Sequence, residues 1–222
     1  NFTQRSTSDA SSNVPYNFYT SGTHRVKLSG SGLQTVSFDD PSSSYSHFNV
    51  LEITNASAEW IDFQPSFSAV TLISNAGVSN GLKIQSMNWV LTENQTINGD
   101  LELLNSTLDL AGKTLTVTGN LIQSGGILSV NSGSLIVEGD YLIETPAVDA
   151  DSSPTTSSGV LYMLNDADKV LVNGNFVMDS YHAHNSYLTA GELEVQGNFT
   201  QRSTSDASSN VPYNFYTSGT HR

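Results

Sequence analysis

The chain has 222 residues, with 21 acidic against 8 basic residues, a net charge of −13 and no cysteine. This charge argues against binding to nucleic acid or to an anionic membrane surface, because either would need clustered Lys and Arg. The lack of cysteine removes disulfides and thiol chemistry, and no apolar run approaches the roughly 18 residues that span a bilayer.

Short apolar alternations separated by Gly, Asn and Ser clusters run along the chain, a pattern typical of strands and turns. A polar loop at 5–21 opens the chain, and we expect its aromatic residues to cap one face of the fold. Further polar loops are expected at 145–159 and 179–187. The expected strands lie at residues 26–28, 34–38, 47–54, 59–63, 69–73, 82–84, 89–90, 121–122, 127–130, 135–137, 161–164, 170–172 and 193–196.

A Gly-[Asn/Asp]-[Leu/Phe/Tyr] motif begins at Gly99, Gly119 and Gly139, with a spacing of 20 residues, and returns at Gly174 and Gly197. Each 20-residue period holds three short strands and three turns, which is one coil of a stacked repeat fold. Insertions in later periods are accommodated as surface loops. The sequence therefore predicts an all-β fold, a single-stack β-solenoid (β-helix) with about eight coils per 197-residue unit and irregular loop insertions.

Stacking the periods aligns apolar residues that we expect to point inward. Leu101, Leu121 and Tyr141 fall in one column. A second pair of columns places Leu115 and Val117 over Leu135 and Val137, followed by Val170 and Val172 and then by Leu193 and Val195.

Residues 198–222 repeat residues 1–25 without a mismatch, at an offset of 197 residues. We therefore divide the chain into one complete β-solenoid unit, 1–197, and the start of the next identical unit, 198–222. We expect that the chain is cut from a longer array of near-identical units, or that it is a circularly permuted frame of such an array.

Three stretches carry a resemblance to a known group of proteins: VLTENQTINGDLELLNSTLDLAGKTLTVTGNLIQSGG, YLTAGELEVQGNFTQ and GTHRVKLSGSGLQTVSFDDPSSSYSHFNVLEITN. They resemble the long tandem repeats of very large secreted proteins of Gram-positive bacteria. The resemblance implies a role at the cell surface or in an extracellular matrix, and it transfers no catalytic residue.

His182 and His184 lie two residues apart in the loop at 179–187, and a His-x-His pair is part of many zinc and copper sites. A complete site needs a further ligand, for which Asp179 is the nearest candidate. The alternative is a solvated polar loop, and we assign no metal ligand here.

Acidic residues gather beside the loop at 145–159 and in a turn near residue 40. Carboxylates on neighbouring coils bind calcium in some proteins, but the glycine-rich nonapeptide of calcium-binding β-rolls is absent from the sequence. Calcium is thus the one cofactor left open, with a solvated acidic surface as the alternative. The residues concerned are Asp39, Asp40, Asp149, Asp151, Asp166 and Asp168.

The polar column after the motif glycines suggests a ladder of stacked Asn and Asp side chains that hydrogen-bond along the stack. Ordinary turn preference is the alternative, and both explanations are compatible. The column contains Asp100, Asn120, Asp140, Asn175 and Asn198.

Aromatic residues and sequons offer weaker signals. Trp60 and Trp89 are expected in the core or over one face of the stack, and Tyr16, Tyr19 and Tyr181 are candidates for stacking on carbohydrate. We assign no glycans to the Asn-x-Ser/Thr sequons, which begin at Asn1, Asn55, Asn94, Asn105 and Asn198.

Polysaccharide lyases and hydrolases with this type of fold carry paired carboxylates in a groove along the strands. Here the inward columns are apolar and the acidic residues lie mainly in loops, so we predict no enzyme and no catalytic residue. The sequence favours a structural repeat of a stiff extracellular filament or surface stalk, whose partners are identical units stacked end to end. The alternative is a secreted adhesin that binds glycans or other cells through its lateral loops.

Overall fold

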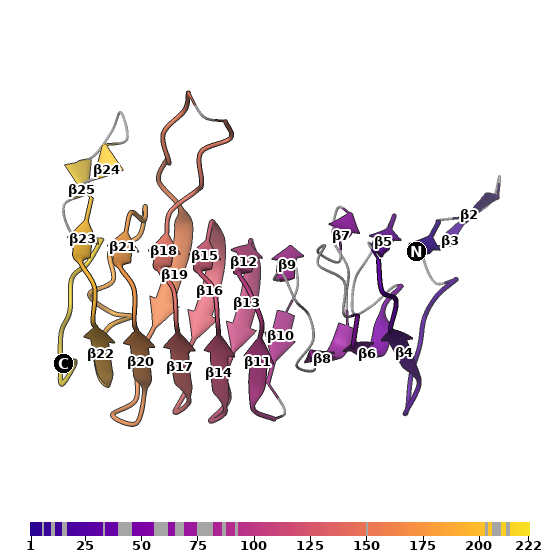
Figure 1. The fold of residues 1–222 in the computed structure, drawn as a ribbon, viewed down its shortest axis with the longest axis horizontal. Coiled ribbons are helices and arrows are strands. Elements are labelled where there is room, and N and C mark those ends of the chain that lie inside the picture. The colour runs from indigo at the N-terminus through magenta and orange to yellow at the C-terminus, as the bar shows by residue number, and fades with distance from the viewer. Residues whose placement is uncertain are drawn as a thin grey trace.

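The computed structural model describes residues 1–5, 7–9, 12–14, 17–32, 34–39, 46–55, 62–64, 69–74, 82–85, 88–91, 93–149, 151–202, 204–205, 210–211 and 214–222. Across these ranges the regular elements are all β-strands. The described residues contain no helix that is long and apolar enough to span a membrane. Most strands belong to parallel sheets that extend along the long axis of the molecule (Figure 1). The prediction of an all-β fold is therefore confirmed.

Three parallel sheets organise the chain from residue 82 onward. The first contains, in spatial order, β23 (Phe199–Gln201), β21 (Phe176–Met178), β18 (Tyr141–Ile143), β15 (Leu121–Gln123), β12 (Leu101–Leu104) and β9 (Leu82–Gln85). The second contains β10 (Asn88–Val90), β13 (Ser106–Asp109), β16 (Gly125–Ser129) and β19 (Ser158–Tyr162). The third contains β11 (Gln95–Ile97), β14 (Thr114–Val117), β17 (Ser134–Val137), β20 (Lys169–Val172) and β22 (Glu192–Val195).

The N-terminal part has two shorter parallel sheets, and one antiparallel hairpin lies near each end of the chain. One three-stranded parallel sheet contains β1 (Phe2–Gln4), β5 (Thr35–Phe38) and β7 (Asp62–Gln64), and another contains β4 (Arg25–Leu28), β6 (Phe48–Ile53) and β8 (Ala69–Ser74). The hairpins pair β2 (Thr7–Asp9) with β3 (Ser12–Val14), and β24 (Thr204–Ser205) with β25 (Asn210–Val211).

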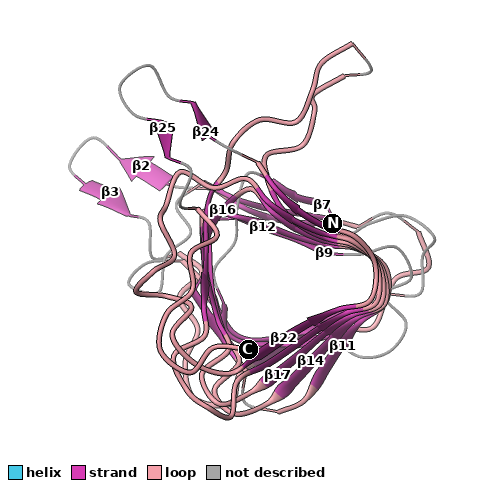
Figure 2. Ribbon diagram, turned by 90° about the vertical axis from the view of Figure 1, so that its left-hand side faces the viewer, coloured by secondary structure: helices cyan, strands magenta, loops and turns pink. Residues whose placement is uncertain are grey.

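Each 20-residue period adds one strand to each of the three sheets, so β12, β13 and β14 are followed by β15, β16 and β17. Leu101 pairs with Leu121, and Leu121 with Tyr141, as the sequence predicts. All three side chains are fully buried in the interior that the sheets surround in Figure 2. The other predicted columns also pair in register, through β14 with β17, β17 with β20, and β20 with β22.

The motif glycines lie where successive layers approach most closely. The amide of Gly119 donates to the carbonyl of Gly99 at 2.9 Å, and the amide of Gly139 donates to that of Gly119 at 3.0 Å. A Cβ at Gly139 would lie 2.7 Å from the Gly119 carbonyl oxygen, which leaves no room for a side chain. Close backbone approach therefore explains why the motif begins with glycine.

Four insertions whose strands are described follow strands on one side of the stack. Single residues, Asn105 and Ser124, join β12 to β13 and β15 to β16, whereas residues 144–157 join β18 to β19. Residues 179–191 follow β21, and the two hairpins follow β1 and β23. The hairpins and the loop after β18 project from the body in Figure 2.

The structure refines the loop predicted at 5–21, because β2 and β3 within it pair as an antiparallel hairpin. Phe18 then packs against the core, and the predicted core residue Trp89 is 1% exposed. Tyr16, Asp40 and Trp60 lie outside the described residues.

Candidate functional site at the repeat junction

The two copies of the repeated segment, residues 1–25 and residues 198–222, share three local features among their described residues. Each contains a hairpin in the same register, a Gln–Asn side-chain hydrogen bond and an edge-to-face pair of Phe rings. The Nε2–Oδ1 distances are 2.7 Å for Gln4–Asn17 and 2.5 Å for Gln201–Asn214, and the ring centroids are 4.7 Å apart for Phe2–Phe18 and 4.6 Å for Phe199–Phe215.

The second copy adds a layer to the sheets of the unit before it. β23 pairs in parallel with β21, which places Phe199 opposite Phe176. At the other end of the segment, the amide of Arg222 donates to Gly191 O at 2.8 Å and its carbonyl accepts from the amide of Leu193 at 2.9 Å. Arg222 therefore hydrogen-bonds alongside the start of β22.

The predicted Asn/Asp ladder is confirmed: the side-chain amides of Asn175 and Asn198 donate to the Oδ1 atoms of Asp140 and Asn175, each at 3.1 Å, and backbone amides make further links at every step. Each side-chain Oδ1 accepts a hydrogen bond from the backbone amide of the next ladder residue. The donor–acceptor distances are 2.6 Å for Asn120 to Asp100, 2.9 Å for Asp140 to Asn120, 2.7 Å for Asn175 to Asp140 and 2.9 Å for Asn198 to Asn175. The ladder thus passes from the unit into the repeated segment at Asn198.

Aromatic rings continue the interior across the junction. The Phe199 ring stacks on Phe176 with centroids 5.3 Å apart, and Phe176 meets Tyr141 edge to face, also at 5.3 Å. Phe199 remains 46% exposed although it also contacts Phe215. The outermost layer therefore presents an open hollow of about 320 Å³, which Phe199 and Phe215 help to line.

An ion pair joins the repeated segment to the unit. Arg202 pairs with Glu144, whose side chain is only 8% exposed. A carboxylate this buried needs a charged or hydrogen-bonding partner. The sequence gives no signal for this pair, because the two residues are 58 positions apart and lie in different insertions.

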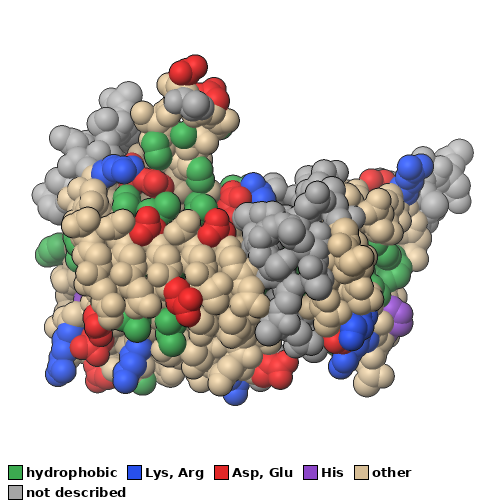
Figure 3. All heavy atoms as spheres, viewed as in Figure 1, with side chains coloured by type: hydrophobic (Ala, Val, Ile, Leu, Met, Phe, Trp, Pro, Cys, Tyr) green, Lys and Arg blue, Asp and Glu red, His purple; other side chains and the backbone are tan. Residues whose placement is uncertain are grey.

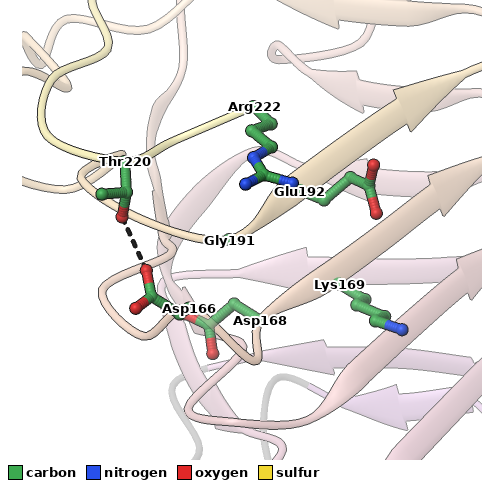
Figure 4. Close-up of a pocket in the computed structure, with 7 residues that line it drawn as sticks. All are labelled: Asp166, Asp168, Lys169, Gly191, Glu192, Thr220 and Arg222. Carbon is green, nitrogen blue, oxygen red and sulfur yellow. Dashed lines mark hydrogen bonds between the residues drawn. The ribbon is translucent and has the colours of Figure 1, made fainter.

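A pocket of about 430 Å³ lies where the end of the repeated segment meets β20 and β22 (Figure 4). Thr220 Oγ1 donates to Asp166 Oδ1 at 2.6 Å, which ties the segment to the turn before β20. The lining residues are Asp166, Asp168, Lys169, Gly191, Glu192, Thr220 and Arg222. The lining thus includes two basic and three acidic residues, so the pocket is a charged region between layers.

Asp168, one of the calcium candidates, has a structural role in that turn. It is fully buried, and its carboxylate accepts from the backbone amides of Ser132 at 2.6 Å, Leu164 at 2.7 Å and Asn165 at 3.0 Å. A carboxylate whose oxygens accept three amide hydrogen bonds holds the turn closed without a cation.

The remaining acidic candidates do not converge. Asp149 and Asp151 are exposed in the loop after β18, where the amide of Asp151 donates to Asp149 Oδ1 at 3.1 Å, and Asp39 is exposed at the end of β5. In Figure 3 acidic side chains lie at separate places on the body and on the projecting loop. Within the described ranges no three His, Asp or Glu side chains are grouped as a metal site would require.

The two loop histidines differ in solvent exposure. His182 is exposed, whereas His184 is fully buried, accepts from the amide of Leu161 at Nε2 (3.2 Å) and donates from Nδ1 to the carbonyl of His182 (3.0 Å). Burial lowers the pKa of His184 to about 4. Both ring nitrogens are occupied, so His184 acts as a neutral core residue that anchors the loop to β19. The buried Asp179 lies in the same insertion, at the end of β21.

Two tyrosines considered for carbohydrate stacking are on the surface. Tyr19 is 54% and Tyr181 is 51% exposed. Tyr19 packs edge to face on His47, with ring centroids 4.7 Å apart, so one edge of its ring is already in contact with the protein.

Comparison of this chain with protein-family models, with curated proteins and with solved structures returns no match.

Proposed function

We propose that residues 1–197 are one unit of a single-stack β-solenoid, and that tandem units build a stiff extracellular filament or surface stalk. The position of residues 198–222 carries this proposal. A segment with the opening sequence of the unit adds the next layer to two sheets at the far end of that unit. A following unit that continues in the same way extends the stack without a break.

The strand order supports a count of about eight coils per unit. Within residues 1–197, eight strands follow one another on one side of the stack, namely β1, β5, β7, β9, β12, β15, β18 and β21. Parallel strands are about 4.8 Å apart, so one unit advances the axis by about 40 Å.

Stacking is also what stabilises each layer. A single coil has an apolar inner face that it cannot bury alone, and its strands present unpaired backbone groups at both edges. A tandem array supplies the covering layer at every internal junction, so only the ends of the whole filament remain open.

Charge favours attraction at the junction and repulsion between filaments. The unit has 6 basic and 20 acidic residues, a net charge of −14, whereas the repeated segment has two arginines and one aspartate. Arg202 pairs with Glu144, and Arg222 lies at the pocket that contains Glu192. Neighbouring filaments repel through their acidic surfaces, which keeps them soluble.

The test is a length series. Chains of one, two and four units are made by appending residues 26–222 to the full chain, and their lengths are measured by small-angle X-ray scattering and electron cryo-microscopy. We expect straight rods that lengthen by about 40 Å per unit. Flexibly linked globules, or particles whose length does not grow in proportion, would contradict the proposal.

A second candidate, an adhesin, is favoured by the arrangement of the insertions. The hairpin after β1, the loops after β18 and β21 and the hairpin after β23 all leave from strands at corresponding positions, so in an array they form a ridge along the filament. Tyr181 is exposed on this ridge. This role is supported if the chain binds to a glycan array and if binding is lost in Tyr181→Ala but kept in Tyr19→Ala. It is contradicted if neither the unmodified chain nor the Tyr19→Ala variant binds a glycan.

The proposal assigns no catalytic residue, cofactor or metal to the chain. Its partners are identical units of the same array, and for the second candidate extracellular glycans or other cells. The location is the cell surface or the extracellular space.

A further inference from the structure

The two copies of the repeated segment have different neighbours in the stack. The upper face, toward the following layer, is covered in one copy, and the lower face, toward the preceding layer, is covered in the other. In the first copy, the upper face is covered by the following layer: Phe2 packs on Phe38 and Phe48 with ring centroids 5.3 and 5.0 Å apart. The side chain of Asn1 accepts from the amide of Thr35 at 2.9 Å. This bond continues the ladder upward from the residue that corresponds to Asn198.

In the second copy the lower face is covered instead. Phe199 stacks on Phe176, Arg202 pairs with Glu144, and the amide of Asn198 donates to Asn175. The ladder therefore links the segment to the preceding layer in the second copy and to the following layer in the first copy.

A glycine shows most clearly that the lower face of the first copy is open. Gly22 and Gly219 are equivalent, with φ angles of +66° and +64°. A Cβ on Gly22 would meet nothing within 4 Å, whereas a Cβ on Gly219 would overlap the Thr189 carbonyl oxygen. Residues of the first copy, among them Phe2 and Arg5, also line an open hollow of about 200 Å³.

We propose, on the basis of the filament function above, that the far end of the unit binds residues 1–25 of a second copy of this chain through the contacts that residues 198–222 make. This acceptor face includes Glu144, Asp166, Asn175, Phe176, Thr189 and Gly191. The occupant is identified by sequence, because residues 1–25 are identical to the segment already seated there.

Within one chain, residues 198–222 cover the acceptor face and exclude that second copy. The two segments compete for one surface with identical contacts, and the attached one has the advantage of a high effective concentration. A polypeptide of residues 1–222 is therefore expected to be monomeric while the attached segment is docked, and to associate head to tail once that segment is displaced.

The identical copies provide a matched test within the full chain. The triple variant Phe199→Asp, Arg202→Glu and Gly219→Val removes the stacking, the ion pair and the close approach that hold the second copy. The control carries the same changes at the equivalent residues, Phe2→Asp, Arg5→Glu and Gly22→Val. Hydrogen exchange reports whether residues 198–222 are displaced, and analytical ultracentrifugation reports the mass.

For the first variant we expect displaced residues 198–222 and a weight-average mass that rises at least twofold with concentration. The control remains monomeric, and so does the chain with all six changes, because it lacks a competent donor segment. The inference is wrong if residues 198–222 stay protected, if the displaced variant stays monomeric, or if the six-fold variant associates equally. None of these outcomes alters the length series of covalent units, so the filament proposal stands or falls separately.

Discussion

Leu121→Asp tests the inward columns most directly. Leu121 is fully buried between Leu101 and Tyr141 of the neighbouring layers. Removing its side chain from the core forfeits about 2–3 kcal/mol of apolar burial. Placing a polar carboxyl group there without a hydrogen-bond partner costs about 1–3 kcal/mol more. The free energy of unfolding is expected to fall by about 3–6 kcal/mol, which is a large part of the 5–15 kcal/mol that stabilises a typical domain.

The matched control is Ile122→Asp, at the next residue of β15. Ile122 points to the opposite face of the strand and is partly exposed, so the same substitution there should change stability by less than about 1 kcal/mol. Chemical denaturation followed by circular dichroism gives the two free energies. Hydrogen exchange should localise the loss to β12, β15 and β18, because each layer contacts only its neighbours. Equal midpoints for the two variants would refute the inward assignment of the Leu121 column.

Three further predictions concern the junction and the loop beside it. The free energy of unfolding should fall by up to about 3 kcal/mol from pH 6.5 to pH 4. In this range His184 takes up a proton in the unfolded chain but not in the folded chain, where its pKa is about 4. Denaturant titrations should show this pH dependence reduced in His184→Gln and kept in His182→Gln. Asn175→Ala removes an acceptor for the next ladder amide, so that amide should exchange faster and stability should drop by about 1–2 kcal/mol. Arg202→Ala leaves a buried carboxylate without its partner and should lower the thermal midpoint, whereas Arg5→Ala, at the equivalent exposed residue, should leave the midpoint unchanged.

The periodic part of the fold was predictable because its residues repeat their environment every 20 positions. Leu101, Leu121 and Tyr141 share a column in the sequence and in the structure. The ladder was predictable for the same reason, although its backbone donors were not, because a sequence pattern does not show which atom a side chain reaches. Gln123 falls in an interior column, and the structure supplies the reason that it is tolerated: the Tyr141 hydroxyl donates to its side chain at 2.7 Å.

The site was less predictable because the insertions break the period. His184 looked like half of a metal site, yet it is buried by contacts with β19 that have no fixed spacing in the sequence. The pairing of Arg202 with Glu144 likewise joins two insertions. The exact duplication predicts that 198–222 starts a unit like the one that 1–25 starts. Identical sequences cannot show that Gly219 lies against the Thr189 backbone whereas Gly22 has no neighbour within 4 Å of a Cβ.

The backbone hydrogen bonds between layers run along the axis of the stack, and this direction determines how a filament of this kind responds to tension. A pulling force loads those bonds directly, so the coil at a free or weakened end detaches first. Detaching one 20-residue coil removes about 4.8 Å of stack and releases about 65–70 Å of extended chain. The proposed filament would be rigid under small loads. Above a threshold force, each detached coil would contribute more than ten times its stacked length, about 60–65 Å of added chain, and would absorb mechanical work before any covalent bond is strained.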